Sequence, residues 1–305
     1  MADSRQLHWG AEALWQELDA LLPGLSVEVV ASADSTNTRL LERARRSSGW
    51  RNAPVTTPGQ LDTTPAALDM PTPHGRRNHD TQPCLLVAET QTGGRGRQGR
   101  AWFSSAGGSL TFSLGLPLNP SAWSGLSLAV GVALADALDA PHADQPPRIG
   151  LKWPNDLWLM DAPGRGRKLG GVLIETVAVG GQRMAVIGIG LNLLPQPLPQ
   201  EQSSGFACLH ELWNDIDAPQ ALKRVAAPLV RAVRQFERDG LEPFAAAYRQ
   251  RDLLLGQPVR TTDPGVPEGR AEGIDAQGAL RVRAGAGAGE LHTLFSGEVS
   301  VRPTA

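Results

Sequence analysis

The spacing of apolar positions changes several times along the chain, and each spacing predicts a type of element. Apolar side chains recur at near-helical intervals over residues 7–22, 34–46 and 123–140, and a further helical stretch is predicted over 217–250. Shorter apolar or alternating runs predict strands at 25–31, 84–89, 109–116, 148–153, 156–160, 168–179 and 183–194. The mixture of strands and helices predicts an α+β protein, in which a mixed β-sheet is covered by helices.

Two segments depart from this pattern. Residues 49–83 are rich in Pro and Thr and show no sustained period, which predicts a flexible insertion. From residue 253 onward the runs are short and alternate between Gly-rich turns, which predicts a small β-barrel. We therefore expect a larger domain over 1–252, interrupted by the 49–83 insertion, and a small domain over 253–305.

Composition narrows the class of protein. The chain has 305 residues and a formal net charge of −2 from 29 basic and 31 acidic side chains, so no overall charge draws it to nucleic acid or to a membrane surface. No apolar run approaches the roughly 20 residues that span a bilayer, and the first residues do not resemble a signal peptide. The two cysteines lack metal-ligand spacing. These features predict a cytoplasmic protein without a resident metal site.

The most unusual segment is "TGGRGRQGRAWFSS", residues 92–105. Three arginines stand among four glycines, and no Asp or Glu occurs between Glu89 and Asp136. The segment satisfies G-x-G-x-x-G, but a β-like run follows where a dinucleotide-binding site needs a helix, and there is no Walker A motif. Arginines that repel each other beside flexible glycines favour a loop that closes on an anion, although a solvated hairpin tip is the alternative.

Two further segments add cations to this picture. In "LKWPNDLWL" the alternation separates Lys152 from its apolar neighbours and places it at a Pro-Asn-Asp turn. In "KLGGVLIET" Lys168 begins a strand whose Gly170 and Gly171 leave room for a ligand against the backbone. Each segment alone is also compatible with an ordinary surface turn. Together the three segments predict a nucleotide phosphate site, stabilised mainly by electrostatics.

Five motifs in order, "DSTN", "GRGRQGRAW", "KWPNDL", "KLGGVLIE" and "GIGLNL", resemble the successive motifs of the biotin protein ligases. The resemblance is strong over 34–194 and looser over the tail. It implies a catalytic domain like that of class II aminoacyl-tRNA synthetases, followed by a small SH3-like barrel. It also implies a reaction in which biotin and Mg-ATP give biotinyl-5'-AMP. The biotinyl group then passes to a lysine of the biotin carboxyl carrier protein of acetyl-CoA carboxylase.

The resemblance also assigns residues to roles. The catalytic residues would be Arg97, Lys152 and Lys168. Biotin would be bound by Ser35, Thr36, Asn37, Gln91, Arg95, Gly96, Arg97, Lys168 and Gly171. The nucleotide would be bound by Arg95, Arg100, Trp102, Lys152, Asn155, Asp156 and Asn192, with Asn155 and Asp156 shaping the pocket or its Mg²⁺. Trp102 is equally compatible with a place in the core.

Three expectations on partners and alternatives complete the sequence picture. Only 33 residues precede Asp34, too few for the DNA-binding domain that some family members carry, so no specific DNA binding is expected. A homodimer is possible, and no membrane partner is expected. The alternatives are a lipoate protein ligase, which shares the fold and the adenylate chemistry, and an RNA-binding module that uses the RG-rich loop.

Overall fold

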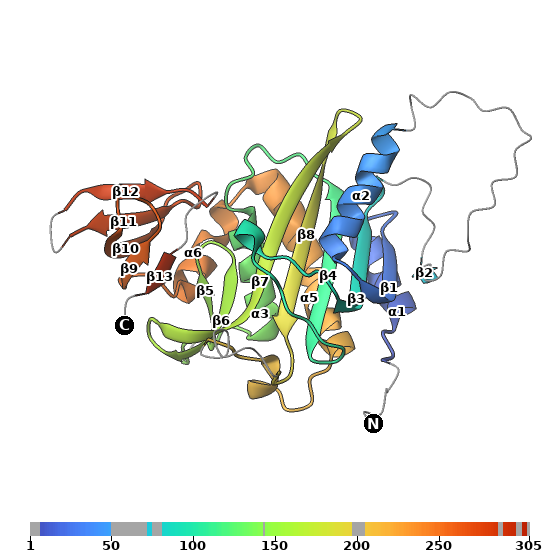
Figure 1. The fold of residues 1–305 in the computed structure, drawn as a ribbon, viewed down its shortest axis with the longest axis horizontal. Coiled ribbons are helices and arrows are strands. Elements are labelled where there is room, and N and C mark those ends of the chain that lie inside the picture. Colours follow the sequence, from blue (N-terminus) through green and yellow to red (C-terminus); the bar gives the residue numbers. More distant parts are fainter. Residues whose placement is uncertain are drawn as a thin grey trace, which may run out of the picture.

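A computed structural model describes residues 7–49, 72–74, 81–142, 144–196, 205–285, 289–296 and 301–303 (Figure 1). An eight-stranded sheet in the order β2-β1-β3-β4-β8-β7-β6-β5 forms its centre. β1 and β3 pair in parallel and the remaining neighbours pair antiparallel. The strands are β1 (Ser26–Ala33), β2 (Thr72–His74), β3 (Cys84–Gln91), β4 (Ser109–Pro117), β5 (Ile149–Lys152), β6 (Asp156–Ala162), β7 (Arg165–Val179) and β8 (Gln182–Asn192). The predicted mixed sheet is thus confirmed.

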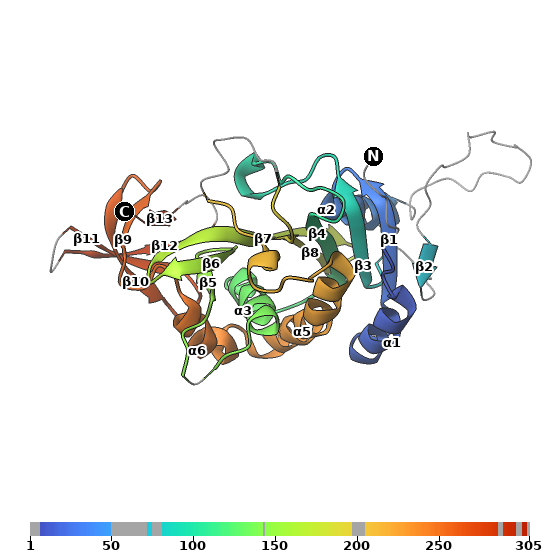
Figure 2. The ribbon, with the colours of Figure 1, turned by 90° about the horizontal axis from the view of Figure 1, so that it is seen from below.

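The two faces of the sheet differ. One face packs against α1 (Ala11–Leu21), α3 (Leu126–Leu138) and α5 (Ala218–Asp239), which lie together on the same side of the sheet in Figure 2. Alternate side chains of β4 and β8, such as Phe112 and Ile187, belong to this core. The other face carries α2 (Thr36–Gly49), whose Leu40 and Leu41 pack against a smaller cluster. The cavity described below lies where α2 begins.

The helical stretch predicted over 217–250 divides into two helices. Asp217 caps α5, since its Oδ1 accepts a hydrogen bond from the backbone N–H of Gln220 at 2.8 Å, as expected for this residue type. α5 ends at Gly240, whose φ of 68° lies in the left-handed region that glycine adopts without strain. α6 (Glu242–Arg251) follows and leads into the C-terminal part.

The C-terminal residues form a separate five-stranded antiparallel sheet in the order β12-β11-β10-β9-β13. Its strands are β9 (Pro258–Thr261), β10 (Glu268–Ile274), β11 (Leu280–Ala284), β12 (Leu291–Leu294) and β13 (Val301–Pro303). Its buried side chains, among them Val259 and Val282, belong to the same hydrophobic cluster as the main sheet. The indole N–H of Trp153 donates to the carbonyl of Gly278 at 3.0 Å, which ties this sheet to the end of β5.

The structure corrects two expectations about strands. Thr72–His74, inside the predicted flexible insertion, forms a strand that pairs antiparallel with β1. Three residues are too few to show a period, and the open edge of β1 supplies the hydrogen-bond partners. Most of the 49–83 segment lies outside the described residues. Lys168 does not begin its strand, because β7 already starts at Arg165 as part of a hairpin with β6.

Candidate active site

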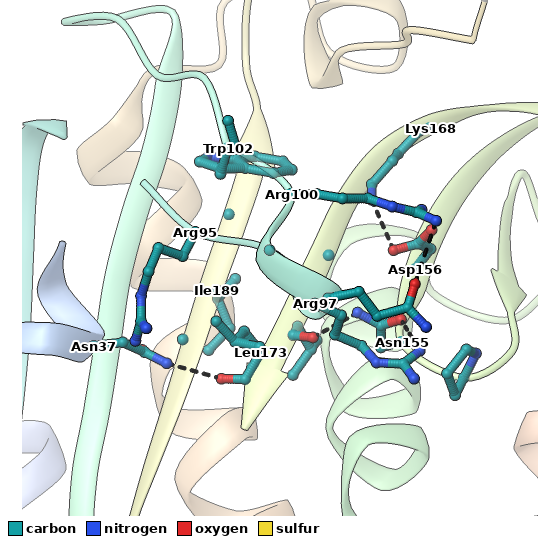
Figure 3. A pocket seen from close by; sticks show the side chains of 18 of the residues that line it. Asn37, Arg95, Arg97, Arg100, Trp102, Asn155, Asp156, Lys168, Leu173 and Ile189 are labelled. Carbon is teal, nitrogen blue, oxygen red and sulfur yellow. Dashed lines mark hydrogen bonds and ion pairs between the residues drawn. The ribbon is translucent and has the colours of Figure 1, made fainter. Parts of the chain in front are cut away.

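A cavity of about 160 Å³, partly open to solvent, lies over β4, β8 and β7 between the start of α2 and residues 92–105, here called the arginine loop. Figure 3 shows Asn37 and Arg95 at one end and Arg97, Asn155, Asp156 and Lys168 at the other. All the residues predicted to bind biotin or nucleotide line this cavity except Asn192: Ser35, Thr36, Asn37, Gln91, Arg95, Gly96, Arg97, Arg100, Trp102, Lys152, Asn155, Asp156, Lys168 and Gly171. Side chains from segments over 130 residues apart in sequence thus meet in one place.

One end of the cavity is built from buried hydroxyl and amide groups. Ser35 directly precedes α2, with Oγ 3.4 Å from the backbone nitrogen of Thr38, and Thr36 and Asn37 are each 3% exposed. Gln91 Oε1 accepts from the backbone N–H of Thr36 at 2.7 Å. Ser113 Oγ, on β4, lies 2.6 Å from both Thr36 Oγ1 and Asn37 Oδ1. These contacts hold a set of neutral donors and acceptors in fixed positions.

Glycines on β7 and β8 make room for this cluster. Gly188 lies directly under Asn37 and Gly190 directly under Trp102, so that a Cβ at either position would overlap the side chain above it. Gly171, opposite Gly190, leaves space beside Asp156 and Lys168. Gly170 has a different reason to be glycine, because a Cβ there would overlap the backbone and Leu191 of β8. Of the predicted pair, only Gly171 lines the cavity.

The arginine loop closes one side of the cavity. Gly94 approaches the carbonyl of Trp102 so closely that no Cβ fits, and Gly99 has a φ of 71°. Arg97 Nη1 donates to Asn155 Oδ1 at 3.2 Å, and its Nη2 donates to the carbonyl of Ser296 in the C-terminal part. Burial lowers the pKa of the Arg97 guanidinium from its ordinary value. The loop thus contacts the Pro-Asn-Asp turn and the C-terminal sheet domain.

The loop also has an acidic partner that the local sequence does not show. Arg95 Nη2 lies 2.7 Å from Glu175 Oε2, and Asn37 Nδ2 donates to the same oxygen at 2.9 Å. Glu175 stands on β7, 80 positions from Arg95. The fold thus brings an acidic side chain to Arg95 that the neighbouring sequence lacks, while the anion expected for the loop stays a prediction.

Two lysines and one carboxylate form the cationic end. Lys168 Nζ lies 2.8 Å from Asp156 Oδ1, on the adjoining strand β6. Burial lowers the pKa of Lys152, Asp156 partly opposes this, and the positive charge of Lys168 adds to the decrease, so that the pKa falls to about 8. Lys152 Nζ also lies 5.3 Å from the ring centre of Trp158. A buried lysine with few counter-charges is suited to receive phosphate oxygens.

Asn192 has a different place from the one predicted. It is 6% exposed, and its Nδ2 donates to the carbonyls of Lys168 at 3.2 Å and Ala207 at 3.0 Å. The backbone N–H of Ala207 also donates to the carbonyl of Lys168 at 2.8 Å. Asn192 therefore fixes the main chain that carries Lys168 and does not line the cavity itself.

Sequence reasoning missed Ser113, Glu175, Gly188 and Gly190. The strand register could have found them, because Ser113 pairs with Gly188, Gly188 pairs with Leu173, and Glu175 points to the same face of the sheet as Leu173.

Among the described residues, no group of three or more His, Cys, Asp or Glu side chains is placed to hold a metal ion. No helix in the described part of the chain is long and apolar enough to cross a membrane.

The arrangement joins two chemistries in one cavity. Buried hydroxyls and amides suit a neutral ring that both donates and accepts hydrogen bonds. The positive charges of Lys152 and Lys168 at the other end reduce the repulsion between two anionic groups that must approach each other.

Comparisons with known proteins agree with this geometry. Residues 74–192 match the Biotin/lipoate A/B protein ligase family, and residues 254–302 match the Biotin protein ligase C terminal domain. The bifunctional ligase/repressor BirA of Escherichia coli is 32% identical over 92% of this chain and 75% of its own length. The biotin--[acetyl-CoA-carboxylase] ligase of Mycobacterium tuberculosis is 36% identical over 76% of this chain and 84% of its own.

A solved structure gives the same result for the fold. The biotin protein ligase from Aquifex aeolicus, in complex with biotin and ATP, aligns with a TM-score of 0.64 and 25% identity over 91% of this chain and 99% of that one. The identities and the shared length, taken with the motifs gathered around one cavity, establish that this chain belongs to the biotin protein ligase family.

Proposed function

We propose that this protein activates biotin with ATP and transfers the biotinyl group to a lysine of the biotin carboxyl carrier protein. The observation that carries this proposal is the pairing, in one cavity, of the buried polar cluster around Asn37 with the cations Arg97, Lys152 and Lys168. The polar cluster suits the ureido ring of biotin, and the cations suit the place where the carboxylate and the phosphate react.

In the first step a carboxylate oxygen of biotin forms a bond to the α-phosphorus of ATP, and the bond to the leaving pyrophosphate breaks. Both reactants are anionic, so the approach is disfavoured in the absence of cations. Lys168, held by Asp156 and by the hydrogen bonds to its main chain, is assigned to the reacting carboxylate and α-phosphate. Lys152 is assigned to the ATP phosphates, with Arg95 and Arg100 beside them.

In the second step the amine of the acceptor lysine attacks the acyl carbon, AMP leaves, and the amine proton passes to solvent. The mixed anhydride must be kept from water until the acceptor arrives. Arg97 is assigned to this retention, since its loop covers the cavity and its guanidinium contacts Asn155 and Ser296. The side chain of Trp102, above Gly190, is assigned to the adenylate.

Mg²⁺ is part of the proposal as a companion of ATP. Among the described residues that line the cavity, Asp156 is the single acid, and Asn155 adds an amide oxygen on the same turn. Such a donor set fits a magnesium ion that takes most of its ligands from phosphates and water. When bound, the ion neutralises phosphate charge, and the protein side chains retain the roles given above.

The described residues favour biotin over the lipoate alternative. The ureido ring of biotin can add to the hydrogen bonds that join Thr36, Asn37 and Ser113, whereas the dithiolane ring of lipoate has no hydrogen-bond donors and gains nothing from this cluster. The RNA-binding alternative lacks support, because Arg95 pairs with Glu175 and Arg97 donates to Asn155, so these two arginines are engaged within the protein.

The test uses the purified protein with ATP, Mg²⁺ and either biotin or lipoate. We expect pyrophosphate release with biotin, and a carrier domain added afterwards should gain the mass of one biotinyl group by mass spectrometry. Equal release with lipoate, or no release with biotin, would reject the proposal. Carrier range, a homodimer and the absence of specific DNA binding stay predictions.

A further inference from the structure

Glu175 holds two cavity residues with one carboxylate. Arg95 Nη2 lies 2.9 Å from Oε1 and 2.7 Å from Oε2, and Asn37 Nδ2 donates to Oε2 at 2.9 Å. The Glu175 side chain is 28% exposed and stands just outside the cavity lining. One acidic group thus connects the buried polar cluster with the arginine loop.

The carboxylate decides how the Asn37 amide is oriented. Asn37 Nδ2 donates to the carbonyl of Leu173 at 3.2 Å as well as to Glu175, which turns Oδ1 toward Ser113 Oγ at 2.6 Å. A carboxylate only accepts hydrogen bonds, so the nitrogen of the amide must face it. Figure 3 shows the resulting direction of Asn37 toward Leu173.

The same carboxylate tethers the loop. Glycines on both sides of Arg95 give the loop few side chains with which to hold its position. An exposed ion pair by itself contributes little, because solvent screens it. Here Asn37, which is 3% exposed, fixes the carboxylate on the other side, so the arginine meets an acceptor that is already in place.

We propose that Glu175 is a positioning residue for the biotin site, which acts through Asn37 and Arg95 and couples the polar cluster to the loop. This inference rests on the proposed function, because it states how the residues assigned to biotin are held. Glu175 touches neither Lys152 nor Lys168 in the described contacts, so its loss should affect binding more than chemistry.

The test is Glu175→Gln, which keeps the shape and removes the charge. Asn37 and Arg95 both donate to Glu175, and a glutamine would place its own NH₂ group, which cannot accept, against one of them. The loss of one hydrogen bond to a charged group should raise the Kd for biotin about 10- to 100-fold. The rate of pyrophosphate release at saturating biotin should change by less than about threefold, since Lys152 and Lys168, which are assigned to the reacting charge, do not contact Glu175. The matched control is Glu272→Gln in the C-terminal sheet, where Glu272 also pairs with an arginine and is 31% exposed.

A second measurement does not depend on any ligand. Amide hydrogen exchange of residues 93–101 in the ligand-free protein should be faster in Glu175→Gln than in the parent and unchanged in Glu272→Gln. In an Arg95→Met background, Glu175→Gln should no longer change exchange in the loop, because the group through which it acts is gone.

The outcomes separate the two proposals. A parent protein that releases no pyrophosphate with biotin rejects the proposed function, and the exchange experiment still decides whether Glu175 holds the loop. A parent that works while Glu175→Gln binds biotin as tightly or more tightly rejects the role of Glu175. Tighter binding would mean that Glu175 competes with the ligand for Arg95.

Discussion

Gly188 on β8 lies directly beneath Asn37 on α2, close enough that the amide occupies the place of the missing Cβ. The strand and the helix can approach this closely only because residue 188 has no side chain. The relationship links the sequence "GIGLN", which carries no functional group at this position, to the polar end of the cavity.

Gly188→Ala should therefore displace Asn37. We expect the Kd for biotin to rise at least about tenfold, since a displaced amide costs at least one buried hydrogen bond. The comparison is Gly115→Ala, where the new Cβ would lie 3.1 Å from a flexible end of Leu40, under the same helix but outside the cavity. Calorimetric titration of both variants with biotin measures the difference. Equal affinities for the two variants would contradict the role of Gly188.

Lys152 should make ATP binding depend on pH. Its pKa of about 8 in the folded protein means that it is mostly neutral at pH 8.5, and phosphate oxygens should restore its proton. Binding at pH 8.5 should take up a proton, whereas binding at pH 6.5 should not take one up at Lys152. Titrations in buffers of different ionisation enthalpy measure this uptake, with Lys152→Met as the control. If the heat of ATP binding at pH 8.5 does not depend on the buffer, Lys152 does not contact the ATP phosphates.

The same pKa fixes the sign of a stability effect. Between pH 8 and 10.5 the unfolded chain holds a proton on Lys152 that the folded chain has lost. The contribution of Lys152 to the free energy of unfolding therefore rises with pH between pH 8 and 10.5.

Lys168→Ala should slow formation of the adenylate. Lys168 is held by Asp156 and by Asn192, so the variant loses a cation that is in place before the reaction begins. Such preorganised charges are worth about 10²-fold or more in rate. Single-turnover pyrophosphate release measures the effect. A variant that retains the parental rate would show that Lys168 is not the group that stabilises the reacting charge.

Arg97→Gly should instead release the intermediate. Its hydrogen bonds to Asn155 and Ser296 belong to the loop that covers the cavity, and losing charge-assisted bonds of about 1.5 to 3 kcal/mol means roughly ten- to more than a hundredfold faster escape. The variant should still make adenylate but should label lysines on an added bystander protein, detected by biotin blotting. If it makes no adenylate, or keeps it as firmly as the parent, the assignment is wrong.

Arg251→Met should destabilise the whole fold. Arg251 is 4% exposed, and its guanidinium pairs with Asp136 and Asp139 at 2.8 and 2.9 Å and donates to the carbonyl of Ile149. Removing the buried arginine leaves Asp139, 14% exposed, without compensation, whereas solvent screens Asp136, which is 36% exposed, so the cost should be about 3 kcal/mol, at the low end for a broken buried pair. Urea unfolding measures the loss. Arg283→Met should lower the free energy of unfolding much less, because Arg283, which pairs with Glu272, is more exposed.

Local patterns were enough for most elements. Apolar periodicity predicted α1, α3, α5 and the strands near their observed bounds, because each element buries one face. The division at Gly240 and the strand Thr72–His74 were missed, since a helical period continues across a single break and three residues show no period.

The candidate site was predictable where its residues carry their own chemistry. Charged and amide side chains beside glycines indicated the cavity, and all but Asn192 line it. Glu175 and Ser113 could not be found locally, because their partners are 80 and 76 or more positions away and only strand register brings them together.

The indole of Trp153 that binds the carbonyl of Gly278 has a consequence for any attempt to shorten or recombine this protein. Trp153 is 1% exposed and directly follows Lys152, so a chain cut at the expected boundary near residue 252 would open the wall behind that lysine to water. The small C-terminal sheet thus supports the side of the cavity on which Lys152 and Trp153 lie. A chimera that takes it from a relative would need to import the residues that meet Trp153 together with it.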